Sequence, residues 1–302
     1  MKGYTDKPDK GRLSPDSRAS GLKIITLTAI ALIAFAANTV LGRLALGSGS
    51  IDAAGFTVVR LFSGAVVLFL ITMGGKSGDS IPARGGWFPA AMLFLYAITF
   101  SFAYLSLDTG TGALILFGAV QITMIAASLL AGHRLHASEW IGVTVAFAGF
   151  VYLVLPGVTA PSTAGFVLMS VAGMAWGIYT VKGRGSRFPL ADTAWNFMRT
   201  VPFIAVLGIV GMEQLHFSKE GILLAVLSGG ITSGVGYAVW YAALGALSAT
   251  QAAVVQLLVP VLAALGGVVF VSETLTLRLL VSAVMILGGI LMVVLGKRIK
   301  KR

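Results

Sequence analysis

The feature that most constrains this chain is a series of apolar stretches, each about as long as a bilayer is thick. A helix rises about 1.5 Å per residue, so about 20 apolar residues cross the roughly 30 Å of hydrocarbon in a membrane. Ten stretches of this kind predict an all-α membrane protein with ten transmembrane helices. They are residues 22–46, 52–73, 87–107, 111–131, 138–156, 162–182, 191–212, 220–243, 248–270 and 276–296.

Composition agrees with a polytopic membrane protein. Hydrophobic residues make up 57% of the chain and charged residues only 11%, whereas soluble domains carry about 25% charged residues. The mean hydropathy is +0.93. There is no cysteine, which excludes disulfides and thiolate metal sites. The connections are short and rich in Gly, Pro, Ser or Asp, so we expect no soluble domain between the spans.

Lys and Arg residues in the short loops predict the orientation, because cytoplasmic loops carry an excess of them. The basic residues gather in the two tails and in the loops of one side of the membrane. We therefore expect a bacterial inner-membrane location, with a cytoplasmic tail over 1–21 and a basic cytoplasmic tail over 297–302. The N-terminal tail is too polar for a signal peptide. The net charge of +11 thus indicates topology rather than nucleic-acid binding. The acidic residues of the opposite side are Asp52, Asp108, Glu213, Glu220 and Glu273.

The two halves of the chain carry a weak internal repeat. Arg43 aligns with Lys182 at an offset of 139 residues, and Arg60 aligns with Arg199 at the same offset. Further along, the offset becomes 140 residues, where His133 meets Glu273. The alignment keeps its register over most of each half.

Each half holds five spans, an odd number, so the second copy would insert into the membrane upside down. Inverted repeats are typical of transporters, whose substrate site lies near the midplane between the halves. We therefore expect two inverted five-helix repeats around a central cavity, TM1–TM5 over 22–156 and TM6–TM10 over 162–296.

Nearly the whole chain resembles a known family. The stretch LLVPVLAALGGVVFVSETLTLRLLVSAVMILGG, residues 257–289, has a Pro in the ninth span, a Glu at the exit of that span and small residues in the tenth. With the order of spans and the Arg inside the second span of each half, it resembles the EamA-type carriers of the drug/metabolite transporter superfamily. Within that superfamily it is most similar to the YddG-type aromatic amino-acid exporters. The residues at the pattern's positions are Pro260, Glu273, Ser282 and Gly289.

The first half departs from the family pattern. Val120 and His133 stand where the pattern would have Pro and Glu. The two halves are therefore not expected to move identically. The resemblance implies a carrier of amino acids or related small metabolites.

Arg60 and Arg199 lie about eight residues inside their spans, at a depth of roughly 12 Å. An arginine in hydrocarbon costs roughly 3 kcal/mol. Each could donate to helix-end carbonyls of a neighbouring span, or one could hold a substrate carboxylate through a bidentate contact. Two matched arginines on opposite sides cannot both reach one midplane site, so we interpret both as structural or gating residues. Pro260, which removes a helix hydrogen bond, is interpreted in the same way.

Aromatic and amide residues inside the spans are the candidate substrate site. Their spacing places aromatic faces on spans 3 and 8, and an aromatic pocket with few charges suits apolar and aromatic side chains. Amide side chains would orient a zwitterion. Alternatively, the aromatic residues form interfacial belts and the amides join helices. The candidate substrate-binding residues are Asn38, Tyr96, Phe100, Gln121, Trp176, Tyr179, Asn196, Tyr237, Trp240 and Gln256.

The motifs of common enzymes are missing from the sequence. The stretch GGKSGD at 74–79 lacks the earlier glycine of a phosphate loop, and no H-E-x-x-H motif occurs. No cluster of His or carboxylate residues has metal-ligand spacing. We therefore expect neither an enzyme nor a cofactor or metal site.

The spans also lack a carboxylate at mid-depth, where proton-coupled carriers usually keep a titratable group. The sequence predicts an exporter of aromatic or apolar amino acids and related metabolites. It would work by alternating access and facilitated diffusion, without strong proton coupling. The expected partners are a small-molecule substrate and the lipid bilayer, not nucleic acid. The alternatives are an efflux carrier for drugs or other metabolites and, less favoured, a passive channel. The oligomeric state has no sequence signal.

Overall fold

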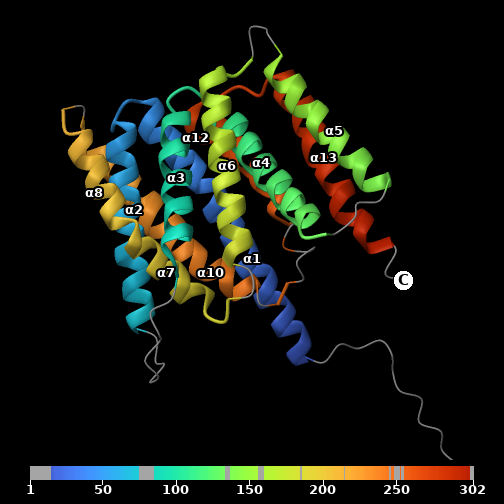
Figure 1. The fold of residues 1–302 in the computed structure, drawn as a ribbon, viewed down its shortest axis with the longest axis horizontal. Coiled ribbons are helices and arrows are strands. Elements are labelled where there is room, and N and C mark those ends of the chain that lie inside the picture. Colours follow the sequence, from blue (N-terminus) through green and yellow to red (C-terminus); the bar gives the residue numbers. More distant parts are fainter. Residues whose placement is uncertain are drawn as a thin grey trace, which may run out of the picture.

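A computed structural model describes most of the chain (Figure 1). The described residues are 15–74, 85–132, 137–155, 160–183, 186–213, 215–244, 246–247, 252 and 255–299.

Helices account for nearly all of the described residues, and each predicted span contains helix. The first half forms α1 (Pro15–Gly47), α2 (Ala53–Gly74), α3 (Trp87–Ala103), α4 (Thr109–Leu130) and α5 (Ala137–Val154). The second half forms α6 (Thr163–Gly183), α7 (Pro189–Arg199), α8 (Val201–Val210), α9 (Lys219–Val226), the π-helix η1 (Leu227–Val235), α10 (Gly236–Leu244), α12 (Leu258–Val271) and α13 (Leu277–Ile299). The seventh span is thus α7 with α8, and the eighth is α9, η1 and α10.

Six helical segments in the described part of the chain are long and apolar enough to cross a membrane. Shorter apolar helices occupy the remaining predicted spans: Trp87–Ala103, Glu139–Leu153, Leu258–Val271 and Leu277–Val293. The prediction of an all-α, multi-pass membrane protein is confirmed. The count of ten crossings stays a prediction.

Two spans are not single continuous α-helices. Pro202 sits in the first turn of α8, where its missing N–H costs nothing, and α7 ends at Arg199, shortly before it. In the eighth span, η1 packs against α2 so closely that a Cβ atom on Gly229 would lie 2.0 Å from the Arg60 carbonyl oxygen. The glycines of η1 therefore serve close packing of two helices.

The helices form a bundle with two distinct edges (Figure 1). At one edge, α5 and α13 pack along each other; α2, α7 and α8 lie at the other. Between these edges, α6 packs against α3 and α4, while α1 packs against η1, α10 and α12. The fifth and tenth predicted spans thus lie together at the outside of the bundle.

A contact between two loops gives the relative direction of α2 and α7–α8. Asp52 N donates to the His216 carbonyl at 3.2 Å, and Ser218 N donates to the Ser50 carbonyl at 3.0 Å. The chain enters α2 directly after the first of these loops, and α8 ends shortly before the second. Because α2 leads away from this contact and α8 leads toward it, α2 and α7–α8 run in opposite directions.

Candidate substrate cavity

A cavity of about 610 Å³ lies inside the bundle. Its walls come from α1, α4, α6, α7, α10 and the start of α3, together with residues before α12. It extends to the end of the bundle formed by the start of α3, the end of α6 and the start of α7, which we name the Lys182 end. Lys182, Gly183 and Ser186 line the cavity there, and Gly183 is exposed. The volume falls within the range of about 300–1,000 Å³ found for small-molecule sites.

A second cavity, of about 30 Å³, shares part of its wall with the first. Phe35, Trp176 and Tyr237 line both cavities, and Asn38 and Tyr96 line only the smaller one. The two cavities are therefore neighbouring parts of one candidate site, separated by aromatic side chains.

The wall is built around Trp176. Its ring is stacked on Tyr179 with a centroid distance of 5.3 Å and on Tyr237 at 5.2 Å. The ring of Tyr96 lies 5.0 Å from it. Phe35 contacts Tyr237 edge-on at 5.9 Å. Aromatic residues of α1, α3, α6 and α10 thus meet at one place, which no single span could show.

The structure assigns the predicted site residues to three places. Those lining the larger cavity are Gln121, Trp176, Tyr179, Asn196, Tyr237, Trp240 and Gln256. Asn38 and Tyr96 line the smaller cavity. Phe100 lines neither: it is fully buried behind the wall, next to Tyr96 and Tyr104.

Asn38 belongs to a buried polar network that joins α1, α3 and η1. Its Oδ1 atom accepts hydrogen bonds from Ser228 at 2.7 Å and from Thr232 at 3.3 Å. Its Nδ2 atom donates to the Tyr96 hydroxyl at 3.4 Å. Sequence analysis missed Ser228 and Thr232, although their i, i+4 spacing in an apolar span places both on one helix face.

Asn196 joins α7 to the segment that precedes α3. Its Oδ1 atom accepts from Gly86 N at 2.9 Å, and its Nδ2 atom donates to the Tyr179 hydroxyl at 3.4 Å. Thr193, one turn earlier, donates to Tyr241 at 3.1 Å. These bonds hold the wall of the cavity near the Lys182 end.

The cavity carries charges that the sequence analysis did not assign to it. Lys182 and Asp192 both line it. One carboxylate oxygen of Asp192 accepts from Ser186, and the other is buried without a hydrogen-bond partner in the described part of the chain. The first turn of α7 thus brings an acid into the wall.

Arg60 and Arg199 differ, although they align in the repeat. Arg60 is 2% exposed, and its Nη2 atom donates to the Tyr96 hydroxyl at 2.8 Å. Arg199 is partly exposed and donates to the Trp195 carbonyl of its own helix at 3.3 Å. The hydrogen bond that Arg60 makes in the described part of the chain thus goes to a tyrosine hydroxyl rather than to a helix-end carbonyl.

Pro260 lies in the first turn of α12, four positions after the wall residue Gln256. α12 begins at Leu258, so the missing N–H of this buried proline breaks no helical bond there. Pro260 therefore lies at the start of α12 and does not kink the helix.

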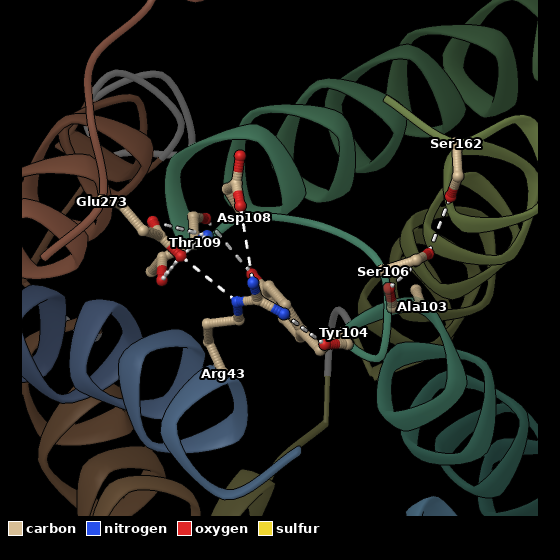
Figure 2. Close-up of polar contacts among 8 residues, drawn as sticks. All are labelled: Arg43, Ala103, Tyr104, Ser106, Asp108, Thr109, Ser162 and Glu273. Carbon is tan, nitrogen blue, oxygen red and sulfur yellow. Dashed lines mark hydrogen bonds and ion pairs between the residues drawn. The ribbon is translucent and has the colours of Figure 1, made fainter. Parts of the chain in front are cut away.

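The opposite end of the bundle is held together by charged residues (Figure 2). Arg43 Nε lies 3.3 Å from a Glu273 oxygen, and Arg43 Nη2 lies 3.5 Å from Asp108. Glu273 also accepts from Thr109, from the backbone N–H at 2.9 Å and from the hydroxyl at 3.0 Å. We name these four residues the Arg43 cluster and this side of the molecule the Arg43 end.

The backbone after α12 positions Glu273. Ser272 ends α12 in the left-handed region, with φ of 57°, and Glu273 N donates to the Gly267 carbonyl at 3.1 Å. Nearby, Ser106 and Ser162 share a hydrogen bond of 2.7 Å that joins the α3–α4 turn to the start of α6. The Arg43 end is therefore bridged, whereas the larger cavity extends to the Lys182 end.

Comparisons with known proteins give the family. Residues 163–295 match the sequence model of the EamA-like transporter family. An uncharacterized protein of Pseudomonas aeruginosa is 48% identical over 264 residues, which cover 87% of this chain and 90% of that protein. The chain carries an EamA-like transporter family domain over residues 163–295. The resemblance to EamA-type carriers is confirmed, while the narrower likeness to aromatic amino-acid exporters stays a prediction.

More distant relatives of this EamA-like transporter agree. An uncharacterized transporter of Archaeoglobus fulgidus is 28% identical, over 63% of this chain and 70% of that protein. An uncharacterized transporter of Bacillus subtilis is 21% identical, over 74% of this chain and 80% of that protein. One crystal structure matches with a TM-score of 0.65 and 20% identity, covering 91% of this chain and 98% of the other, and it supports the fold alone. The chain is therefore a multi-pass membrane transporter, which implies a small-molecule substrate and a lipid environment.

Proposed function

We propose that this transporter exports aromatic and apolar amino acids, and related small metabolites, across the bacterial inner membrane. The observation that carries the proposal is the stacking of Trp176 on Tyr179 and Tyr237 in the wall of a cavity of about 610 Å³. Aromatic rings prefer offset-stacked or edge-on partners and supply a large apolar contact. A substrate with an aromatic or branched apolar side chain would complete this wall.

The polar groups of the cavity suit a zwitterion. Amide groups of Gln121, Asn196 and Gln256 line it, and an amide both donates and accepts hydrogen bonds. Lys182 and Asp192 add one charge of each sign. An amino acid carries an ammonium and a carboxylate group, so it would find partners for both inside an otherwise aromatic pocket.

The transport mechanism we propose is alternating access between two inverted repeats, over 22–156 and 162–296. The opposite directions of α2 and α7–α8 support this arrangement. So does the packing, because α3 and α4 contact α6 as α10 and α12 contact α1. With the Lys- and Arg-rich side in the cytoplasm, the Lys182 end faces inward. The structure would then be the state that loads substrate from the cytoplasm.

Export in this proposal follows the gradient of the solute, with weak or no proton coupling. In the described residues, the acids nearest the transport path are Asp192 in the cavity wall and Glu273 in the Arg43 cluster. Glu273 accepts hydrogen bonds only at the bridged end, away from the aromatic wall. A pH step imposed across a liposome membrane tests the coupling: flux that follows the proton gradient would contradict this part of the proposal.

The experiment that tests the function uses purified protein in liposomes and radiolabelled tryptophan. We expect saturable uptake that is accelerated by unlabelled tryptophan on the opposite side, which separates a carrier from a channel. Trp176→Ala should lower the rate at least about tenfold through lost stacking and packing. Trp140→Ala, on the half-exposed outer face of α5, is the matched control and should leave the rate unchanged. Equal rates for both variants and the unaltered protein would refute the proposed site.

One observation favours efflux of cationic drugs as a second candidate function. The Asp192 carboxylate has a buried oxygen without a hydrogen-bond partner in the described part of the chain, and it faces an aromatic cavity. Cations bind to carboxylates and to aromatic faces. If tetraphenylphosphonium competes with tryptophan, and if Asp192→Asn abolishes only that competition, the transporter also accepts organic cations.

A further inference from the structure

Arg60 is a buried cation without a counter-charge. Its side chain is 2% exposed, and in the described part of the chain no carboxylate lies within ion-pair distance of it. Its Nη1 atom is buried and has no hydrogen-bond partner there. A buried charge that is neither paired nor fully hydrogen-bonded is strongly unfavourable, so such groups are retained where something else compensates them.

Two aromatic rings compensate part of this charge. The guanidinium carbon of Arg60 lies 4.6 Å from the ring centroid of Phe100 and 5.1 Å from that of Tyr96. The Tyr96 hydroxyl accepts from Arg60 Nη2 at 2.8 Å. These contacts leave Nη1 unsatisfied, and none of them supplies a negative charge.

The Tyr96 hydroxyl connects Arg60 to the smaller cavity. Its oxygen accepts from both Arg60 and Asn38, so its proton is available for an acceptor. In the described residues, no hydrogen bond donated by the Tyr96 hydroxyl occurs. Tyr96 and Asn38 both line the smaller cavity, beside Trp176 and Tyr237 of the larger one. Tyr96 and Asn38 therefore line the smaller cavity, while Arg60, which lines neither cavity, is bonded to the Tyr96 hydroxyl behind them.

We propose that Arg60, Tyr96 and Asn38 form a subsite for the carboxylate group of the transported substrate. The proposal rests on the proposed function and narrows it: substrates must carry a carboxylate. The smaller cavity, about 30 Å³, has room for about two water-sized groups, which is the size of the two carboxylate oxygens. The aromatic side chain of the substrate then lies in the larger cavity, across Trp176 and Tyr237.

The charge of Arg60 makes this subsite selective for anions. A guanidinium binds a carboxylate through strong, charge-assisted hydrogen bonds. An amine analogue that lacks the carboxylate would leave Arg60 as uncompensated as it is in the empty protein. Arg199 offers no equivalent subsite, because it is partly exposed and donates to a carbonyl of its own helix.

The test compares ligands that differ only in the carboxylate. In liposomes containing the full-length transporter, unlabelled tryptophan and tryptamine compete with labelled tryptophan, and the ratio of their inhibition constants is measured. We expect a ratio of about 100 for the unaltered protein, the loss of one charge-assisted anchor. Arg60→Gln should reduce the ratio to below about 3. Arg60→Lys should reduce it to about a third of the value for the unaltered protein, or less. Arg199→Gln is the matched control and should leave the ratio unchanged.

The outcomes separate the two proposals. If tryptophan competes and tryptamine competes equally well in the unaltered protein, the carboxylate subsite is refuted and the proposed function stands. If neither tryptophan nor any other amino acid competes or is transported, the proposed function itself fails. Should Arg60→Gln fail to fold, Tyr96→Phe decides, since it keeps the ring and removes the hydroxyl. In Tyr96→Phe, we expect the ratio of the two inhibition constants to fall at least about fivefold. An unchanged ratio would refute the subsite.

Discussion

The two ends of this transporter are built from aligned residues that behave differently. At the Arg43 end, Arg43 pairs with Glu273 and Asp108, and Glu273 is also bound by Thr109. At the Lys182 end, Lys182 instead lines the larger cavity. The residue that aligns with Glu273 is His133, which lies outside the described residues.

If the predicted repeat is correct, one change of residue type, from Glu to His, makes its two ends unlike. A base and an acid at the Arg43 end attract each other, whereas a Lys and a His at the aligned positions provide no opposite charge. One end of the bundle therefore has an ion-paired closure that the aligned positions of the other cannot reproduce. We expect the transporter without substrate to favour the state that is closed at the Arg43 end.

The largest expected effect tests whether the middle of the bundle, which links the two ends, is rigid. Gly229→Ala places a methyl group against the Arg60 carbonyl, at 2.0 Å before relaxation. Overpacking of this kind costs about 3 kcal/mol, so the melting temperature in detergent should fall by roughly 5 °C or more.

The control for Gly229→Ala is Gly288→Ala on α13. A Cβ atom there would meet nothing within 4 Å, so the melting temperature should stay the same. If both variants melt like the unaltered protein, α2 and η1 can separate freely. The middle of the bundle would then not be rigid.

The next effect concerns the Arg43 cluster itself. Glu273→Gln removes the charge that Arg43 and Thr109 bind, and charge-assisted hydrogen bonds contribute roughly 1.5–3 kcal/mol each. We expect the population open at the Arg43 end to rise at least about tenfold. The chain has no cysteine, so a single introduced thiol at Gln121, in the cavity wall, reports access cleanly.

The measurement is the rate at which a membrane-impermeant maleimide labels Gln121→Cys in spheroplasts, where the Arg43 end faces the reagent. Faster labelling in the presence of Glu273→Gln is expected. An unchanged rate would mean that the Arg43 cluster does not hold that end closed.

A smaller effect should follow from giving the Lys182 end an acid. His133→Glu places opposite charges at the two positions that align with Arg43 and Glu273. If the repeat alignment is correct, the thiol at position 121 should become about threefold less accessible in inside-out vesicles, the size expected for one exposed ion pair. Equal labelling with Glu and with Gln at position 133 would contradict the alignment at this position.

The smallest effect is expected at Asp108. Its side chain is 63% exposed, and its ion pair with Arg43 spans 3.5 Å. Exposed ion pairs contribute about 0–1 kcal/mol, so Asp108→Asn should raise labelling from the Arg43 side by less than about threefold. An effect as large as that of Glu273→Gln would assign the closure to Asp108 instead.

Much of the fold could be predicted because it depends on local sequence. The apolarity of the stretches predicted that each span contains helix, but not that the seventh span is interrupted before Pro202 or that α12 begins only at Leu258. The spacing of Tyr237 and Trp240 placed both on one helix face, which lines the larger cavity. These features need only the geometry of a single helix.

The rest of the fold and of the site depended on which helices contact each other. Only the tertiary structure decided those contacts. The sequence alone determined an all-helical membrane protein, an EamA-like pattern and a set of aromatic and amide candidates. It did not determine that Arg43 meets Glu273, 230 positions away, or that Arg60 is buried against Tyr96 while its aligned partner Arg199 is not. Helical periodicity encodes the face of a helix on which a residue lies. The partner of that face depends on packing between segments far apart in the chain, which no local pattern records.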